Sequence, residues 1–598
     1  MSKIGSTIES EVGEGLVVGC FSGFLGDRAD GMTALLRSGV DVLVGDYLAE
    51  LTMLILRKNV DRGGVGYARA FLDQIGPHLG QIAAQGVKVV VNAGGLDPLR
   101  CAADLRALCA DRGVALRVAA ITGDDVRQQL PTMFPDGSGP VNIDTGEALP
   151  VAEVEVLTAN AYLGAWPIVE ALQHGADIVV CPRATDASLV VGPAAWRFGW
   201  NRDDWSRLAG AVVAGHLIEC GSQVTGGNFA FFTEHEHLGT PGMPIAEVLP
   251  NGDCVITKAR DTGGIVTTDT VIAQLLYETG PVEYQNPDVI TDLSTITLAD
   301  LGHDRVRVTG VAGRAPTGTT KLSLTFDGGF RNSVSFGLTG RNIPQKLEWV
   351  REQIATTVGP DSSFDRIRWS VVGPAAVHGN KDQSTAIVVV TARDHTRDRI
   401  GRRGFADKFV ELVTAGPPGM YLVTPPTDAK AYGVQWPSLV DKHHVEVVVH
   451  LDTADAVPVA WGPSSDERRE TPARPKPDLD RSGTGDSRVA FGTLFGTRSG
   501  DKGGMANVGV WARSERAFAW LCHHMTAERL TKLLPELESL RVERHVLPNL
   551  KAVNFLVFGI LEDGAASSTS IDIQAKGLGE YLAAQKIDVP AELVDDRA

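Results

Sequence analysis

The sequence predicts an α/β fold, with a mostly parallel sheet and helices on both faces in the N-terminal region. A second α+β domain and a small α+β C-terminal domain should follow. Short apolar runs alternate with helix-length amphipathic stretches up to about residue 190, which is typical of parallel βαβ units. The length of 598 residues exceeds what one hydrophobic core supports. We therefore expect an α/β domain over 1–294, an α+β domain over 295–462, a linker over 463–487 and the C-terminal domain over 488–598.

The first βαβ unit carries a glycine-rich turn between its strand and its helix. The strand begins near Gly15, and Gly23 and Gly26 follow it before the helix-like run. Glycines let the backbone bend sharply and approach a ligand closely, and a helix start offers unpaired N–H groups to an anion. The spacing meets neither the dinucleotide fingerprint nor the phosphate-binding loop. It therefore predicts an anion or carbonyl site of another kind.

Polar residues follow the predicted strands of this region. In parallel sheets the carboxyl ends of the strands share one edge, and ligands bind beyond it. We expect catalytic carboxylates at Asp27, Asp46 and Asp186, with substrate contacts from Asn92 and Arg183. The alternative is that most of these residues are helix caps and turn residues, positions that Asp and Asn favour.

Arg183 follows an apolar run almost at once, so its guanidinium should emerge at the ligand edge. There it could bind a carboxylate or phosphate through two hydrogen bonds. Asp186 either positions Arg183 or acts as a base; the alternative is a buried ion pair that ties strand to helix. Cys220, close to Glu219 and His216, is expected to be a small buried residue rather than a nucleophile, because adjacency in sequence does not supply the required geometry.

Two later loops, over 219–229 and 260–268, are dense in glycine and small hydrogen-bonding residues. We interpret them as further walls of the same site, with helix capping as the alternative for the second loop. Their predicted substrate-binding residues are Gln223, Gly226, Gly227, Asn228, Gly263 and Gly264.

The remaining chain looks like scaffold. Residues 159–164 should open a helix, and helical patterns occupy 345–356, 406–414 and 517–534. The domain over 295–462 has few polar strand ends, so we expect a scaffold that contributes to a homo-oligomer. The charged, glycine-rich loop over 498–507 either holds an anion, pins its domain onto a neighbour, or is a hairpin turn with one ion pair.

Composition and charge exclude several classes of partner. A net charge of −17 argues against a nucleic-acid surface, which needs a basic face. The seven cysteines include no C-x-x-C pair, which argues against zinc and for a reducing compartment, while magnesium stays open. No apolar run or leader suggests a membrane segment. We expect a cytoplasmic protein with no nucleic-acid or membrane partner, no metal, and no cofactor except CoA as part of the substrate.

Several longer motifs resemble one known family. G-C-F-S-G-F-L-G-D at 19–27, N-A-Y-L-G at 160–164, G-A-D-I-V-V-C-P-R-A-T-D-A-S at 175–188, C-G-S-Q-V-T-G-G-N at 220–228 and T-G-G-I-V-T at 262–267 resemble the N-terminal region of the acyclic terpene utilisation protein A family. R-S-G-D-K-G at 498–503, A-N-V-G at 506–509 and L-P-N-L at 547–550 resemble its C-terminal module. The resemblance implies a role beside acyl-CoA enzymes that degrade branched terpenoid acids such as citronellic or geranic acid. Pro182 departs from the family, where glycine is expected before the arginine.

These observations predict an enzyme of branched-chain or terpenoid carboxylic acid or acyl-CoA catabolism, acting as a lyase or hydratase. Such chemistry beside a carbonyl needs an acid/base group and donors for an enolate oxygen. A small-molecule carboxylate or acyl-CoA is the expected ligand. The alternatives are a non-catalytic binding partner of an acyl-CoA carboxylase or related enzyme, and a nucleotide-dependent oxidoreductase or ligase.

Overall fold

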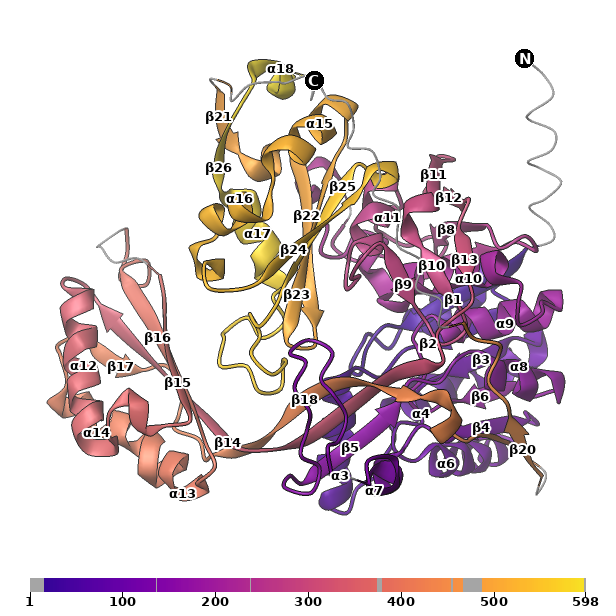
Figure 1. Ribbon diagram of the computed structural model, residues 1–598, viewed down its shortest axis with the longest axis horizontal. Coiled ribbons are helices and arrows are strands. Elements are labelled where there is room, and N and C mark those ends of the chain that lie inside the picture. Colours follow the sequence, from indigo (N-terminus) through magenta and orange to yellow (C-terminus); the bar gives the residue numbers. More distant parts are fainter. Residues whose placement is uncertain are drawn as a thin grey trace.

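The computed structural model describes residues 15–595 apart from 136, 237, 374–378, 453–454, 466–484 and 486, so most of the predicted linker lies outside the described residues. Three parts are visible in Figure 1: a body built on a large sheet, a lobe at the far end of a long strand, and a C-terminal domain beside both. The expected fold class is confirmed, because a large mixed sheet with helices is combined with a small α+β C-terminal domain.

The body is organised on an eleven-stranded sheet in the order β11-β12-β8-β7-β1-β2-β3-β6-β4-β19-β20. Its central five strands are parallel: β1 (Leu16–Ser22), β2 (Val42–Gly45), β3 (Lys88–Val91), β6 (Ile178–Val180) and β4 (Val118–Thr122). Antiparallel strands extend both edges: β7 (Pro244–Val248), β8 (Cys254–Lys258), β12 (Val306–Thr309) and β11 (Thr297–Asp300) on one side, and β19 (Val447–His450) and β20 (Ala456–Val459) on the other.

Helices cover both faces of the parallel strands, which explains their continuous apolar sequences. Successive residues point to opposite faces, so Leu43 packs into one core while Val42 and Val44 pack into the other. The Leu43 face is covered by α2 (Gly31–Ser38), α3 (Glu50–Asp61), α4 (Ala70–Ile75), α5 (Leu79–Gln85) and α6 (Pro98–Asp111). The opposite face is covered by α8 (Trp166–Gln173), α9 (Ser188–Phe198), α10 (Trp205–Glu219) and α11 (Thr268–Leu275).

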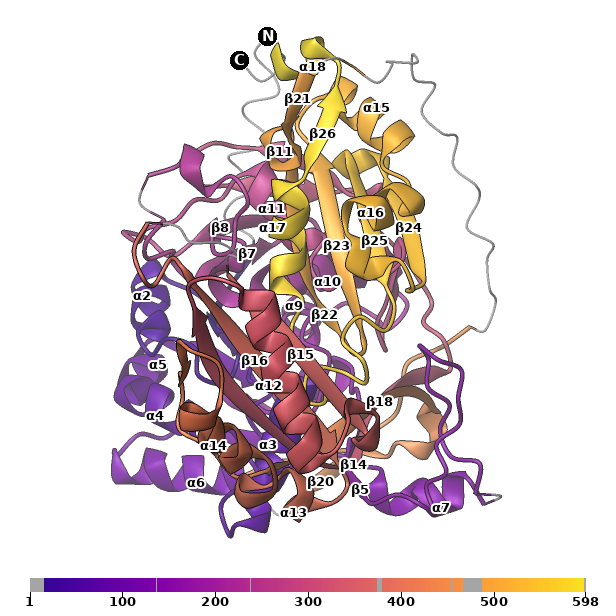
Figure 2. The same cartoon turned by 90° about the vertical axis from the view of Figure 1, so that its left-hand side faces the viewer.

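One long strand, β14 (Thr319–Thr339), joins the body to the lobe. Its first half pairs with β5 (Val156–Ala161) and β18 (Lys430–Asp441), and its second half pairs with β16 (Thr385–Asp394). The lobe also contains β15 (Arg366–Val372), β17 (Met420–Leu422), α12 (Ile343–Val358), α13 (Arg397–Ile400) and α14 (Asp407–Ala415). Helices α12 and α14 pack against the lobe sheet around Phe336 and Phe409 (Figure 2).

The C-terminal domain has an antiparallel sheet in the order β22-β23-β25-β24, backed by helices with a core of its own. Its strands are β22 (Phe495–Lys502), β23 (Met505–Ala512), β25 (Ala552–Val557) and β24 (Val542–Leu547), with β21 (Ser487–Ala490) and β26 (Lys586–Val589) paired apart. Its helices are α15 (Glu515–His524), α16 (Ala527–Leu533), α17 (Lys576–Ala584) and α18 (Ala591–Asp595).

Shorter elements fill the connections of the body. They are α7 (Leu130–Met133), β9 (Glu283–Gln285), β10 (Ile290–Asp292) and β13 (Ala312–Arg314). Within the described part of the chain, no helix combines the length and the apolar character needed to cross a membrane.

The structure differs from the sequence expectations at four places. Strands β11, β12, β19 and β20 from the expected second domain belong to the sheet of the first, because their antiparallel pairing covers its open edges. The sequence predicts that residues 159–164 open a helix, but residues 159–161 complete β5 and residues 162–164 lie in the connection before α8. The helix expected over 517–534 breaks into α15 and α16, because the Thr526 side chain caps a new helix by accepting a hydrogen bond from the Arg529 amide. Over residues 570–585 the sequence predicts a strand followed by a helix, whereas the structure has α17 without a preceding strand, and β26 and α18 follow it.

Two glycine-to-alanine substitutions test the packing of the body in opposite directions. A Cβ at Gly210 of α10 would lie 2.0 Å from the Gly252 carbonyl oxygen, so backbone would have to move. Gly80 of α5 has no atom near its missing Cβ, so alanine there gains helix propensity. We expect G210A to lower the free energy of unfolding by about 2 kcal/mol and G80A to raise it by about 0.5–1 kcal/mol, as measured by chemical denaturation.

Candidate functional site

The edge of the parallel sheet brings four predicted site residues together. Asp46, Asn92, Arg183 and Asp186 follow the carboxyl ends of β2, β3 and β6. The Asp46 carboxylate accepts hydrogen bonds from Asn92 Nδ2 (2.6 Å) and from the Leu48 amide (3.1 Å). Burial and the nearby Asp186 carboxylate raise the pKa of Asp46 well above its usual range, with Arg183 and Asn92 opposing the shift. The surroundings of Asp46 therefore favour its protonated form.

Arg183 is buried and lies between two sets of acceptors. Its Nη1 donates to Asp186 Oδ1 (2.8 Å) and to the Leu48 carbonyl, and its Nη2 donates to the Tyr162 hydroxyl (2.8 Å). The guanidinium also stacks on the Tyr162 ring, 4.3 Å from its centroid. Its Nε has no hydrogen-bond partner among the described residues. The expected ion pair is thus present, and one N–H of the guanidinium is left for a ligand.

A second layer of charge links Arg183 to the long strand β14. The Tyr162 hydroxyl donates to Glu50 Oε1 (2.6 Å), and Lys321 Nζ of β14 donates to the same oxygen (2.9 Å). Burial acts to raise the pKa of Glu50, but the Lys321 and Arg183 cations outweigh it, and the pKa of Glu50 falls. Glu50 is therefore an ionised carboxylate that neutralises Lys321.

A buried Glu219–His216 pair faces this edge from the end of α10. His216 Nε2 lies 3.0 Å from the Gln274 carbonyl oxygen, which can only accept, so Nε2 carries a proton. Burial lowers the pKa of His216 to about 4, so the ring is neutral and Nδ1 is an acceptor. Glu219 Oε1 lies 2.9 Å from Nδ1, and burial and Asp186 raise the pKa of Glu219 well above its usual range. Glu219 is therefore a protonated carboxyl that donates to Nδ1.

The second oxygen of Glu219 is available for chemistry. Oε2 is buried and has no hydrogen-bond partner within the described residues, although buried carboxyl oxygens are normally satisfied. The Asp186 carboxylate contributes to raising the pKa of both Asp46 and Glu219. The side chain of Asp186 keeps 28% of its surface accessible. The site therefore combines one partly accessible carboxylate with two acids whose surroundings favour their protonated forms.

The C-terminal domain completes the site by holding the turn over 276–280 that follows α11. The Glu278 amide donates to Asn507 Oδ1 (2.9 Å), and Lys502 Nζ donates to the Glu278 carbonyl (2.6 Å). Asn507 Nδ2 also donates to the Leu276 carbonyl. Asn554 Nδ2 donates to the Thr279 and Gly280 carbonyls (3.0 and 3.1 Å). Both sides of the Glu278 peptide are therefore bound by another domain.

Glu278 adopts an unusual backbone conformation in this turn. Its φ is +56°, in the left-handed region that non-glycine residues seldom occupy. Burial raises the pKa of its carboxyl, and the Tyr277 hydroxyl and Lys502 oppose the shift. Strain of this kind persists only where surrounding contacts impose it, and here Asn507 and Lys502 supply those contacts.

The charged C-terminal motif is a β-hairpin whose side chains point into the body. Arg498 to Lys502 lie on β22, and the hairpin turns at Gly503. Arg498 donates to Gln223 and stacks on the Tyr277 ring at 4.2 Å, while burial raises the pKa of Asp501 to about 7. For the loop over 498–507 the sequence left three alternatives open. These contacts correspond to the one in which the loop attaches its domain to a neighbouring domain.

The charged and polar residues described so far form one group, which we call the cluster: Asp46, Glu50, Asn92, Tyr162, Arg183, Asp186, His216, Glu219, Glu278, Lys321, Asp501 and Lys502. Asp27 and the first glycine turn lie beside this cluster. The Asp27 carboxylate accepts from the Gly23 and Arg28 amides (2.8 and 2.7 Å), so its oxygens are bound by its own loop. A Cβ on Gly23 would lie 2.6 Å from the Cys220 carbonyl carbon, which explains why only glycine fits there. Gly26 has a φ of +105° and is exposed. This bonding pattern favours a structural role for Asp27.

The second group of predicted glycines is placed elsewhere. Gly226, Gly227, Gly263 and Gly264 contact one another's loops, with the Ile265 amide donating to the Thr225 carbonyl (2.9 Å). Asn228 is exposed with a φ of +56°. Gln223 alone in this group reaches the C-terminal domain through Arg498. Within the described residues, none of the contacts of the four glycines joins them to the acidic cluster.

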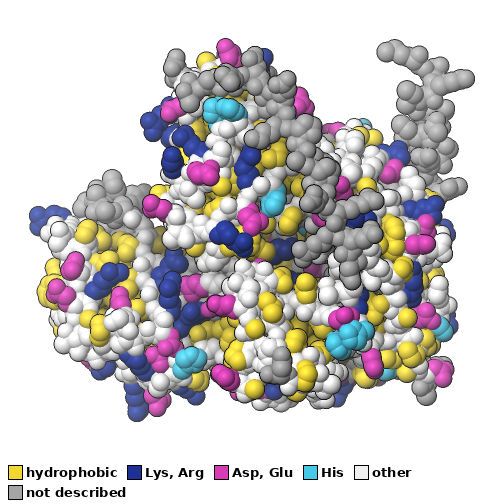
Figure 3. All heavy atoms as spheres, viewed as in Figure 1, with side chains coloured by type: hydrophobic (Ala, Val, Ile, Leu, Met, Phe, Trp, Pro, Cys, Tyr) yellow, Lys and Arg dark blue, Asp and Glu magenta, His cyan; other side chains and the backbone are white. Residues whose placement is uncertain are grey.

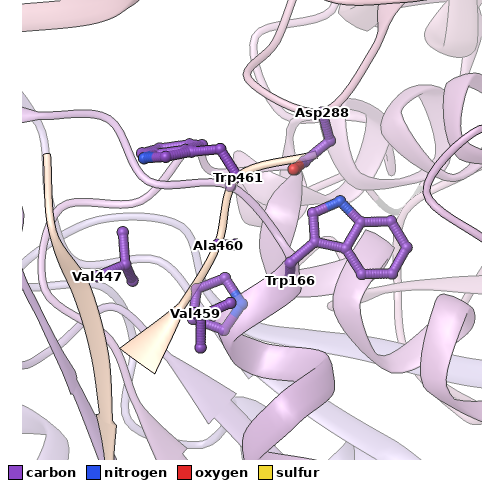
Figure 4. A pocket seen from close by; sticks show the side chains of 8 residues that line it. Trp166, Asp288, Val447, Val459, Ala460 and Trp461 are labelled. Atoms are coloured by element: carbon purple, nitrogen blue, oxygen red, sulfur yellow. The ribbon is translucent and has the colours of Figure 1, made fainter. Parts of the chain in front are cut away.

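Cys220 is not activated as a nucleophile. Burial raises the pKa of the Cys220 thiol well above its usual range, so the group is a thiol and not a thiolate nucleophile. The described part of the chain contains no group of three or more His, Cys, Asp and Glu side chains placed to hold a metal ion. A separate small cavity lies between Trp166, Asp288 and Trp461 (Figure 4). It has room for about one water molecule, so it is not a substrate site.

Five residues of the cluster were not predicted: Glu50, Tyr162, Glu278, Lys321 and Lys502. They come from a helix start, the end of β5, a turn, β14 and the C-terminal hairpin, which only tertiary packing brings together. Lysine, arginine and carboxylate side chains are visible where the three parts of the molecule meet (Figure 3). One signal was available, because Tyr162 and Lys502 belong to the quoted motifs.

Removing the Asn507 side chain tests the grip of the C-terminal domain. N507A would leave the Glu278 amide and the Leu276 carbonyl unsatisfied in a buried place. We expect the free energy of unfolding to fall by about 1–3 kcal/mol, with faster hydrogen exchange over 276–280. N201A, on an exposed turn, should leave both unchanged.

The protonated state of Glu219 predicts a pH-dependent difference in stability. Its folded pKa lies above the usual 4.5, so unfolding releases a proton at higher pH and wild-type stability falls as pH rises above that value. E219Q keeps a donor for His216 Nδ1 but cannot ionise. We expect the stability of E219Q relative to wild type to rise with pH from about 4.5 upward, by at most about 1.4 kcal/mol per pH unit, in pH-resolved denaturation. E536Q, which removes an exposed carboxylate, is the control; a parallel pH profile for E219Q would contradict the assignment.

Comparison with known proteins places this architecture in a family. The family model described as acyclic terpene utilisation family protein AtuA matches residues 16–451, and the model described as AtuA ferredoxin-like domain matches residues 490–588. No curated protein matches the chain. The first match covers most of the body and the lobe. The second match covers the C-terminal domain, whose Asn507 and Lys502 bind the Glu278 peptide. The chain therefore belongs to the acyclic terpene utilisation family.

Proposed function

We propose that the protein is an enzyme of branched-chain or terpenoid carboxylic acid or acyl-CoA catabolism, and that it is a lyase or hydratase. The observation that carries this proposal is the partly accessible Asp186 carboxylate, ion-paired with Arg183 (2.8 Å), in a site where burial and Asp186 raise the pKa of two further acids, Asp46 and Glu219. Addition of water beside a carbonyl needs both a base and an acid in one site. Membership of a family named for acyclic terpene utilisation supports the substrate class.

The roles follow from the protonation states. In a hydration, Asp186 takes a proton from water while the water oxygen bonds to the β-carbon of an unsaturated acid or thioester. Negative charge then develops on the carbonyl oxygen, where the free Nε–H of Arg183 can donate to it. Asp46 returns a proton to the α-carbon, while the unpartnered Glu219 Oε2 accepts a hydrogen bond from the substrate. Exchange of one proton with solvent restores both carboxyls.

The same groups serve carbon–carbon cleavage. A base that removes the proton of a β-hydroxyl starts the break, an acid protonates the enolate fragment, and the cation holds the enolate oxygen in between. Lyase and hydratase chemistry therefore demand the same three roles, which we assign to Asp186 as base, Asp46 as acid and Arg183 as cation.

The contacts of the C-terminal hairpin favour an enzyme over a non-catalytic partner of an acyl-CoA carboxylase. The charged hairpin of the C-terminal domain is turned inward, where Arg498, Lys502 and Asn507 contact the body. A docking piece would present such groups outward. A partner role would be favoured instead by co-purification with a carboxylase and no turnover by the isolated protein, and a thermal shift with NAD(P) or ATP would favour the nucleotide-dependent class.

Turnover by variants of the acids tests the assignment. D46N and E219Q replace neutral carboxyls by neutral amides, so we expect the fold to persist and kcat to fall by about 10²–10⁴-fold. The assay follows hydration or cleavage of a panel of branched unsaturated acids and their CoA thioesters by mass spectrometry. D382N, whose carboxylate is 86% exposed, is the control. Wild-type rates in both site variants would exclude these acids from the chemistry.

A further inference from the structure

Lys502 is a partly buried lysine that has no ion-pair partner within the described residues. It lies at the tip of β22, its Nζ donates to the Glu278 carbonyl (2.6 Å), and it sits 5.6 Å from the centroid of the Tyr284 ring. Among the residues that the structure describes, no carboxylate lies within ion-pairing distance of Nζ. Buried lysines are usually paired, because an isolated ammonium is costly to desolvate.

The two other cations of the cluster are already neutralised. Arg183 is paired with Asp186 (2.8 Å), and Lys321 is paired with Glu50 (2.9 Å). Both pairs sit in the body, whereas Lys502 reaches the cluster from the C-terminal domain. The pairs therefore leave no spare carboxylate for it.

The remaining acids of the cluster do not supply the missing charge. Burial raises the pKa of Glu219 and Glu278 and that of Asp501 to about 7, so burial works against a full negative charge on these groups, although Lys502 opposes the shifts of Glu219 and Glu278. Burial and the neighbouring Lys321 ammonium lower the pKa of Lys502, and Glu278, Glu50 and Glu219 oppose this shift without reversing it. An anion in the site would relieve this cost.

We propose that Lys502 binds a carboxylate of the substrate, so that the C-terminal domain supplies a substrate-binding residue and the substrate class is a branched carboxylate. This inference rests on the proposed function for the reacting groups. Lys502 and Lys321 approach the cluster from different domains, and the hairpin tip at Gly503 lies beside Pro437 of β18. A bound carboxylate would thus bridge the C-terminal domain and the body.

Binding of simple carboxylates to the full-length protein tests the inference. The probes are 3-methylbut-2-enoate and geranate, their neutral amides, and their CoA thioesters, measured by isothermal titration calorimetry. We expect wild type to bind a carboxylate, K502M to bind it at least 10-fold more weakly, and the amide to bind no better than the K502M–carboxylate pair. K532M, which removes an exposed lysine of the same domain, should bind as wild type does.

Stability separates loss of binding from loss of fold. Because Lys502 lacks a buried counter-charge, K502M should unfold at a temperature no lower than wild type in the absence of ligand, while losing the thermal shift given by the carboxylate. A K502M protein that binds as wild type does, equal binding of acid and amide, or no carboxylate binding by wild type would overturn the inference. So would a mass gain on Lys502 after borohydride treatment with a keto acid, because it would assign the amine to covalent chemistry.

The binding assay and the turnover assay together separate this inference from the proposed function. Carboxylate binding that depends on Lys502, together with unchanged turnover in D46N and E219Q, would leave the binding residue standing and remove the acid/base assignment. The carboxylate that Lys502 binds could come from a free acid or from the acyl group of a CoA thioester. Binding of a thioester only when its acyl chain carries a free carboxylate would identify the second source. Both results support the inference.

Discussion

The position of Glu278 in the cluster depends on hydrogen bonds between the C-terminal domain and the turn after α11. Asn507 and Lys502 bind the two sides of the Glu278 peptide, and Asn554 binds the next two carbonyls. Each of these is a buried polar group that would cost about 1–3 kcal/mol if left without a partner. The junction is therefore selective, because only a domain with amides at these positions satisfies the turn. Shape alone would not achieve this.

The body contributes a different kind of constraint. The parallel strands are buried on both faces, so their carboxyl ends are the places where polar residues can gather without disturbing the two cores. Asp46, Asn92 and Arg183 use those positions. Strand β14 then carries Lys321 to the same edge from a segment that also supports the lobe. The charge pattern thus combines a sheet edge, a connecting strand and a separate domain.

Much of the body could be predicted from sequence, whereas the assembly of the site could not. Apolar runs ending in polar residues identified β1, β2, β3, β4 and β6 and placed Asp46, Asn92, Arg183 and Asp186 at one edge, because that signal is local. Lys321 and Lys502 carry no such signal, since their role depends on contacts with residues far along the chain. The boundary expected at 294/295 separated strands that share one sheet, because edge pairing ignores order in the chain. Asp27 looked like its neighbours in sequence, yet its oxygens are bound by its own loop.

The left-handed conformation of Glu278 has a consequence for how such chains can diverge. The turn that contains it belongs to the stretch matched by the first family model, while the groups that impose its conformation belong to the stretch matched by the second. Neither stretch encodes the geometry by itself, so the two must be inherited together. A relative that has lost the C-terminal domain from its chain would need to receive it as a separate subunit.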